Sequence, residues 1–133
     1  MKKIIYYWLP PILWMGCIFL FSSKTKISVS PDYLINFIFF KSLHVIEYAF
    51  LYFLFVRAFF MNHSKKTSST TIFLFSIILS TIYATTDEFH QTFVNSRQGT
   101  FRDIFIDFTG IFLMYIYIKW NLNFLKKFFL WKK

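Results

Sequence analysis

Leu34–Met61 reads LINFIFFKSLHVIEYAFLYFLFVRAFFM, and this stretch decides the fold. It is longer than the about 20 residues that an α-helix needs to cross a bilayer. A strongly tilted helix would accommodate the excess, as would a first portion that lies in the interface and turns inward near Phe40. The stretch also contains Lys41, His44, Glu47 and Arg57. It therefore predicts a membrane helix that brings charged groups into the bilayer.

The composition supports a membrane protein before any other segment is located. The chain has 133 residues, of which 56% are hydrophobic and 25% aromatic, including 21 Phe. A soluble domain of this size could not bury so much apolar surface. Lipid tails can solvate it as well as a protein core does. The single cysteine, Cys17, excludes an intrachain disulfide.

Three further helices are expected around the central stretch. They are Ile4–Phe21, Thr70–Gln91 and Arg102–Trp120. The first run is longer than the apolar part of a signal peptide and lacks an Ala-x-Ala site, which favours a retained helix. Ser30 and Pro31 are a typical helix start, with Ser30 as the N-cap of the second helix. Residues 1–120 are thus predicted to form an all-α bundle of about four transmembrane helices.

Residues 121–133 are predicted to be a basic amphipathic cytoplasmic tail. The aromatic residues around this tail follow helical spacing on one face, namely Trp120, Phe124, Phe128 and Trp131. Lysines accompany them, which suits an anionic membrane surface. A helix that docks on another protein is the alternative.

The net charge of +9 reflects Lys and Arg at the ends of apolar runs, and a nucleic-acid partner is not expected. Ten of these residues belong to the N-terminus, the second loop and the tail: Lys2, Lys3, Arg57, Lys65, Lys66, Lys119, Lys126, Lys127, Lys132 and Lys133. Four belong to the first and third loops: Lys24, Lys26, Arg97 and Arg102. The positive-inside rule therefore places both termini in the cytoplasm.

The acidic residues are the most informative part of the sequence. Asp32 begins a helix, and the other five lie within or at the edge of apolar helices: Glu47, Asp87, Glu88, Asp103 and Asp107. A charge at mid-bilayer costs about 2.5–3.5 kcal/mol on insertion scales, so such residues face the bundle interior and mark functional sites. With both termini inside, three helices bring these acids to one layer near the outer surface.

Helical spacing groups these polar residues further. Lys41, His44 and Tyr48 share one face of their helix, and Glu47 lies beside His44. Asp87 shares a face with Gln91, and Asp103 shares a face with Asp107. Plain interhelical salt bridges are one interpretation, although buried ion pairs rarely add net stability.

A metal site is a second interpretation, and it is not favoured. His44, Glu47, Glu88 and His90 are the candidate ligands. The chain lacks the His-Glu-x-x-His pattern and any set of cysteine ligands. The sequence therefore assigns no cofactor, and a divalent metal stays an open alternative.

Two stretches of the chain resemble the VanZ-like family of bacterial membrane proteins. One runs from Lys41 through His44, Glu47 and Tyr48. The other runs from Tyr83 through Asp87-Glu88-Phe-His90-Gln91 to Arg97, continued by Arg102-Asp103 and Asp107 to Gly110. The opening Trp14-Met15-Gly-Cys-Ile18-Phe19, closing on Ser22-Ser23, fits the family's first helix. The resemblance covers the chain up to Trp120 and implies a multi-pass protein of the bacterial cytoplasmic membrane.

The resemblance implies a role at the cell envelope, since the family's named member is associated with resistance to the lipid-bearing glycopeptide teicoplanin. The favoured hypothesis is a protein that binds or modifies an amphiphile at the outer leaflet, such as a lipid-linked precursor, a glycolipid or a lipoglycopeptide. Candidate catalytic residues are His44, Glu47, Asp87, Glu88, His90, Asp103 and Asp107. Candidate substrate-binding residues are Lys41, Tyr48, Gln91 and Arg97.

Two other functions stay open at this point. The same carboxylates could form the relay of a small proton-coupled transporter or accessory, which would have to form a homo-oligomer because four helices are few. The chain could also be a structural membrane assembly protein. The expected partner in the first hypothesis is a membrane lipid or lipid-linked substrate, and whether a reaction is catalysed is left open.

Overall fold

The computed structural model is a bundle of helices, and it describes residues 2–25, 28–62, 67–95, 97 and 99–129. The helices are α1 (Lys2–Ser22), α2 (Tyr33–Asn62), α3 (Ser69–Gln91), α4 (Phe101–Trp120) and α5 (Leu122–Phe129). No strand occurs among the described residues. The all-α bundle predicted from the sequence is therefore confirmed.

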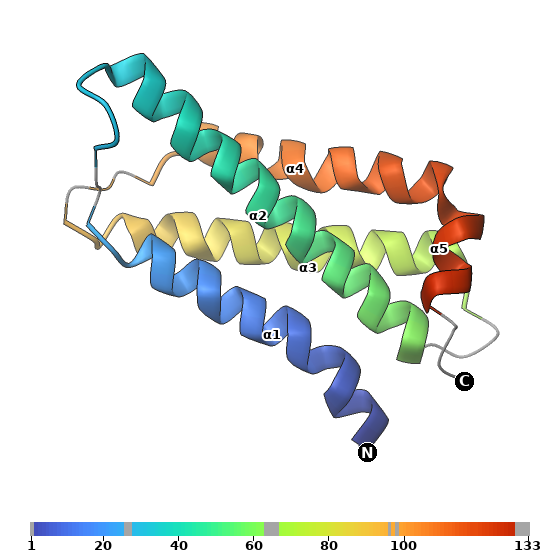
Figure 1. Cartoon of the computed structure of the whole chain (residues 1–133). Helices are drawn as coiled ribbons and strands as arrows, with labels where there is room; N and C mark the ends of the chain where they lie inside the picture. Colours follow the sequence, from blue (N-terminus) through green and yellow to red (C-terminus); the bar gives the residue numbers. More distant parts are fainter. Residues whose placement is uncertain (1, 26–27, 63–66, 96, 98, 130–133) are drawn as a thin grey trace.

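Helix α2 is the centre of the bundle and packs against every other helix. It is continuous over 30 residues, which favours the tilted helix over the alternative with a turn near Phe40. At about 1.5 Å per residue it would span about 45 Å, more than the about 30 Å of a hydrocarbon core. Figure 1 shows it crossing obliquely over α3 and α4, which shortens its projection along the bundle.

The start of α2 differs from the expected cap. The helix begins at Tyr33, and the carboxylate of Asp32 accepts a hydrogen bond from the backbone N–H of Leu34 at 2.8 Å. Ser30 instead accepts from the backbone N–H of Asp32. The Asn36 side chain accepts hydrogen bonds from the N–H groups of Val29 and Ser30 and so holds the preceding loop in place. An aspartate two residues later thus replaces the serine cap.

Among the described residues, three helices are long and apolar enough to cross a membrane, namely Ile5–Ser22 within α1, α2 and α3. Helix α4 has a similar length but contains Arg102, Asp103, Asp107 and Lys119. Its two aspartates are buried in the bundle. The outer surface of the molecule is rich in large exposed apolar side chains, among them Leu13, Leu20, Phe75 and Leu113. Such a surface is typical of a protein that faces lipid.

The bundle has two distinct ends (Figure 1). Helix α1 begins at the end where α5 lies, and the loops that follow α1 and α3 lie at the other end. We call this second end the loop end. Of the residues used above for orientation, Lys26, Lys65, Lys66, Lys132 and Lys133 lie outside the described residues.

Helix α5 contacts both α2 and α4. Leu125 is buried, and the ammonium of Lys126 lies 5.9 Å from the centre of the Phe60 ring. Trp120 and Phe124 are exposed and available to lipid. Trp131 and the side chain of Phe128 lie outside the described residues, so the full aromatic face stays a prediction.

Candidate functional site

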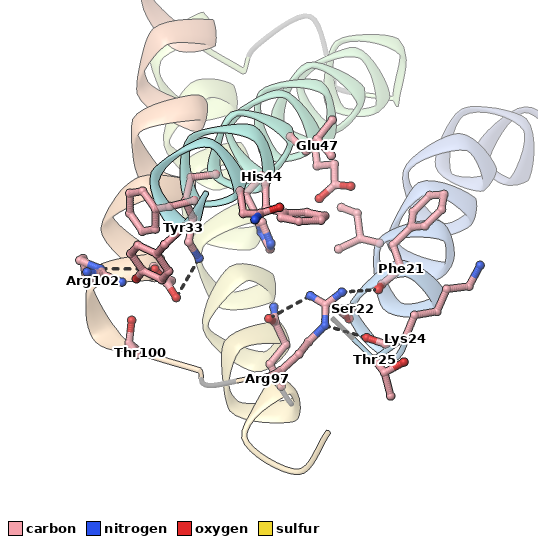
Figure 2. A pocket seen from close by; sticks show the side chains of 18 residues that line it. Phe21, Ser22, Lys24, Thr25, Tyr33, His44, Glu47, Arg97, Thr100 and Arg102 are labelled. Atoms are coloured by element: carbon pink, nitrogen blue, oxygen red, sulfur yellow. Dashed lines mark hydrogen bonds and ion pairs between the residues drawn. The ribbon is translucent and has the colours of Figure 1, made fainter. Parts of the chain in front are cut away.

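A cavity of about 810 Å³ lies at the loop end, between α1, α2, α4 and the end of α3 (Figure 2). One part of its wall is apolar and consists of Ile18, Phe21, Tyr33, Phe37, Phe40 and Leu43. The charged part consists of Lys24, Lys41, Glu47, Arg97, Arg102 and Asp103. His44, Ser22 and Gln91 also line the cavity. The wall is therefore amphiphilic, because apolar and charged side chains face the same cavity.

The close contact between α2 and α4 depends on Gly110. A Cβ atom at this position would overlap the carbonyl oxygen of Val45 and lie 2.9 Å from its carbonyl carbon. Only a residue without a side chain therefore fits between the two backbones. His44 precedes Val45, and Asp107 lies one turn before Gly110. The glycine thus brings His44 and Asp107 together.

His44, Glu88 and Asp107 form a buried cluster beneath the cavity. Their ligand atoms all lie within 4.8 Å of one another. The Nδ1 atom of His44 is 3.3 Å from Oδ1 of Asp107, although the direction of this contact does not make a hydrogen bond. The three residues come from α2, α3 and α4. Of this cluster only His44 also lines the cavity, so it connects the two.

Asp87 has a different environment, in which three neutral groups donate hydrogen bonds to its carboxylate. The donors are the Ser22 hydroxyl at 2.6 Å, the Tyr48 hydroxyl at 3.1 Å and the Gln91 amide at 3.1 Å. They come from α1, α2 and α3 itself. Asp87 is therefore a junction between three helices, and its oxygen atoms are already occupied.

Arg97 ties the loop after α3 to the end of α1, as the dashed lines in Figure 2 show. Its guanidinium donates to the backbone carbonyls of Phe21 and Lys24, both at 2.8 Å, and to the Gln91 side chain at 3.3 Å. All three acceptors are neutral. The positive charge of Arg97 consequently has no carboxylate partner within the described part of the chain.

The same loop also reaches Glu88. The backbone N–H of Thr100 donates to Oε2 of Glu88 at 3.2 Å, and the Gln91 amide donates to Oε1 at 3.2 Å. A Cβ at Gly99 would overlap the backbone carbonyl oxygen of Glu88, so the loop passes very close to α3. These contacts orient the Glu88 carboxylate.

Lys41 and Asp103 form an ion pair at the edge of the cavity. The ammonium of Lys41 is 2.8 Å from Oδ2 of Asp103, and Nε of Arg102 is 3.7 Å from Oδ1. The Arg102 guanidinium also lies 5.0 Å from the centre of the Phe37 ring. Arg102 therefore contributes its charge and its flat face to the cavity wall.

Two of the candidate residues stand apart from the buried cluster. The Glu47 carboxylate faces the space between α2 and α1 in Figure 2, and no described side chain hydrogen-bonds to it. His90 packs its ring against Phe19, with the ring centres 4.6 Å apart. His44 thus contacts Asp107 rather than Glu47. The buried cluster, whose residues could ligate a metal, contains neither Glu47 nor His90.

Sequence reasoning missed Ser22, Arg102 and the aromatic wall as parts of the site. Ser22 ends α1, and its hydroxyl donates to Asp87. A serine that closes an apolar helix next to an outer acidic layer is the signal that could have revealed it. The wall residues carry no such signal, because Phe is abundant throughout the chain.

This arrangement of residues allows two kinds of chemistry. A histidine between buried carboxylates and an open cavity can transfer a proton to a bound molecule. A histidine with two carboxylates can also ligate a divalent metal.

Comparison with known proteins identifies the family. A family model described as VanZ/LLP1 matches residues 7–124, from the first turns of α1 into α5. No curated protein and no solved structure matches the chain. The matched range contains every residue of the cavity wall and of the buried cluster. The resemblance seen in the sequence is thus confirmed, and the chain belongs to the VanZ/LLP1 family.

Proposed function

We propose that this membrane protein binds an amphiphile with an anionic head group in the cavity at the loop end. The ligand belongs to the class of lipid-linked wall precursors, glycolipids and lipoglycopeptides such as teicoplanin. The observation that carries the proposal is the combination, in one cavity, of unbalanced positive charge and an aromatic wall.

The charge of the cavity wall favours an anion. Four cationic side chains line it, Lys24, Lys41, Arg97 and Arg102, against the two carboxylates of Glu47 and Asp103. With His44 neutral, the wall has a formal excess of two positive charges. A phosphate or carboxylate head group would neutralise this excess through charge-assisted hydrogen bonds, which are the stronger kind.

The apolar wall favours a ligand that also carries a hydrophobic part. Phe21, Phe37 and Phe40 lie in the same cavity as the cations. Phe21 is more than half exposed, so the apolar wall continues to the outer surface that faces lipid. A volume of about 810 Å³ suits a head group and the first part of a chain. The rest of the ligand would extend into the bilayer.

The Lys and Arg count along the sequence supports an outward-facing cavity. Ten of these residues belong to the N-terminus, the second loop and the tail, against four in the first and third loops, which favours cytoplasmic termini. Envelope precursors and glycopeptides are both present at that outer surface. A link to glycopeptide resistance is therefore part of the proposal.

Native mass spectrometry of the detergent-purified protein tests the binding step. Polyprenyl phosphate should be retained, whereas the neutral polyprenol of the same length should not. Arg102→Gln should reduce retention at least several-fold. Lys41→Gln should do the same, and Lys41→Arg should restore it because it keeps the charge.

Arg57→Gln is the matched control, since Arg57 lies in the last turns of α2, away from the cavity. It should retain the lipid like the parent. Equal retention of the phosphate and the neutral alcohol would overturn the proposal.

A separate experiment in cells tests the proposed link to resistance. Cells that produce the parent should tolerate more teicoplanin than cells that produce Arg102→Gln. They should not differ for a glycopeptide that lacks the lipid chain.

A further inference from the structure

The buried cluster of His44, Glu88 and Asp107 lies next to the cavity but is a separate feature. Three helices contribute one residue each, and the potential ligand atoms lie within 4.8 Å of one another. Neither Glu88 nor Asp107 lines the cavity. Two carboxylates so close together repel each other unless something positive lies between them.

Asp107 is the least satisfied of the three. Its side chain is 1% exposed, and neither of its carboxylate oxygens has a hydrogen-bond partner in the described part of the chain. The Nδ1 atom of His44, which faces it, has no hydrogen-bond partner either. Buried polar atoms are normally paired, so these three atoms need a partner that the described side chains do not provide.

The nearby cations do not meet this requirement. Lys41 is engaged with Asp103 at 2.8 Å, and Arg97 donates to neutral acceptors. Among the described ion pairs, Glu88 has no Lys or Arg partner and Asp107 has only the histidine. Two negative charges and a neutral imidazole thus have a formal charge that one divalent cation would balance.

We propose that His44, Glu88 and Asp107 bind a first-row divalent cation of the Zn²⁺ or Mn²⁺ type. One imidazole and two carboxylates are a donor set that such ions accept. Metal–ligand distances of about 2.0–2.2 Å place ligand atoms roughly 3.0–3.5 Å apart, and the 3.3 Å between His44 and Asp107 already fits. The wider separations, up to 4.8 Å, would have to shorten by side-chain rotation when the ion binds.

The surroundings supply the outer contacts that metal ligands usually have. Glu88 is oriented by the Gln91 amide and by the Thr100 N–H. His44 lines the cavity, so a metal bound to it would lie near the open space, within reach of water or an anionic head group. The metal site stands on its own geometry, whether or not the cavity binds an amphiphile.

Metal titration of the chelator-treated, purified protein tests the site. One equivalent of Zn²⁺ should bind the parent, and Mn²⁺ should compete for it. Asp107→Asn and Glu88→Gln should each weaken Zn²⁺ binding at least tenfold. Asp32→Asn is the control, because Asp32 lies outside both the cavity wall and the buried cluster, and asparagine keeps the side-chain oxygen that accepts from the Leu34 N–H. Its affinity for Zn²⁺ should stay within about twofold of the parent.

A measurement on the parent alone keeps the proposal testable if a variant fails to fold. Pulsed electron paramagnetic resonance of bound Mn²⁺ should show coupling to one histidine nitrogen. The absence of this coupling, a stoichiometry well below one, or unchanged affinity in folded Asp107→Asn would each overturn the metal site. Loss of lipid binding with metal binding intact would instead count only against the proposed function.

Discussion

The backbone of Gly110 in α4 lies directly against the carbonyl group of Val45 in α2, with no room for a side chain between them. This contact joins the two helices that carry Lys41, His44, Asp103 and Asp107. Both interhelical pairs, Lys41 with Asp103 and His44 with Asp107, lie within about two turns of it. The geometry of the charged layer therefore depends on one close helix–helix contact.

Gly110→Ala should separate α2 from α4 and lower the free energy of unfolding by about 1–3 kcal/mol, because the new Cβ meets backbone that cannot rotate away. SDS titration in mixed micelles measures this change. Gly16→Ala is the control, since nothing lies within 4 Å of a Cβ at that position. It should be neutral or raise stability by about 0.5–1 kcal/mol. Equal effects of the two substitutions would contradict the close-contact argument.

Tyr48→Phe should destabilise the protein by about 1 kcal/mol, because the Tyr48 hydroxyl donates to the buried carboxylate of Asp87. Tyr52→Phe removes a hydroxyl one turn further along α2 that is also buried but has no hydrogen-bond partner among the described residues. That substitution should be neutral or slightly stabilising. Unfolding of the two variants under identical conditions provides the comparison, and a larger loss for Tyr52→Phe would refute the assignment.

Lys41→Met should lower the free energy of unfolding by about 3 kcal/mol, because it leaves the buried Asp103 carboxylate with only the distant Arg102. The double variant Lys41→Met with Asp103→Leu should regain most of this loss. A double-mutant cycle measures the coupling between the two side chains. Arg102→Gln should change stability by less than about 1 kcal/mol, since Arg102 is mostly exposed. Strict additivity in the cycle would show that the ion pair is not formed.

Labelling of single introduced cysteines tests the orientation of the protein in the membrane. In a Cys17→Ala background, Thr25→Cys at the loop end should react with an impermeant thiol reagent added outside intact cells. Asn123→Cys in α5 should react only after the membrane is opened. Both positions are exposed, so a difference between them reports on sidedness rather than burial. The opposite pattern would place the cavity in the cytoplasm.

The helices could be predicted from the sequence because lipid imposes a long apolar run on every span. Leu34–Met61 marked α2 to within a residue at each end. The start of α2 was less predictable, since Ser30, Pro31 and Asp32 are all good starting residues and only the packing of the loop by Asn36 selects among them. Likewise, periodicity alone did not choose between a continuous α2 and a turn near Phe40.

The layer of polar residues could be predicted, but the pairing within it could not. Helical spacing places His44 beside Glu47 on the same helix, whereas the structure pairs His44 with Asp107 on α4. That choice depends on the register between α2 and α4, which Gly110 sets through a contact that no single-helix pattern contains. His90 illustrates the same limit, because its position on α3 directs it toward Phe19 of α1.

The anchoring of α1 has a consequence for biosynthesis. Ser22 is held by Asp87, which follows it by 65 residues, and the Phe21 carbonyl is held by Arg97, which follows it by 76. During translation, α1 leaves the ribosome long before either partner exists. The C-terminal end of α1 therefore lacks both hydrogen bonds until the third helix and the loop that follows it have been synthesised. A nascent chain stalled before Asp87 should leave the end of α1 open to protease, and the completed chain should protect that helix end.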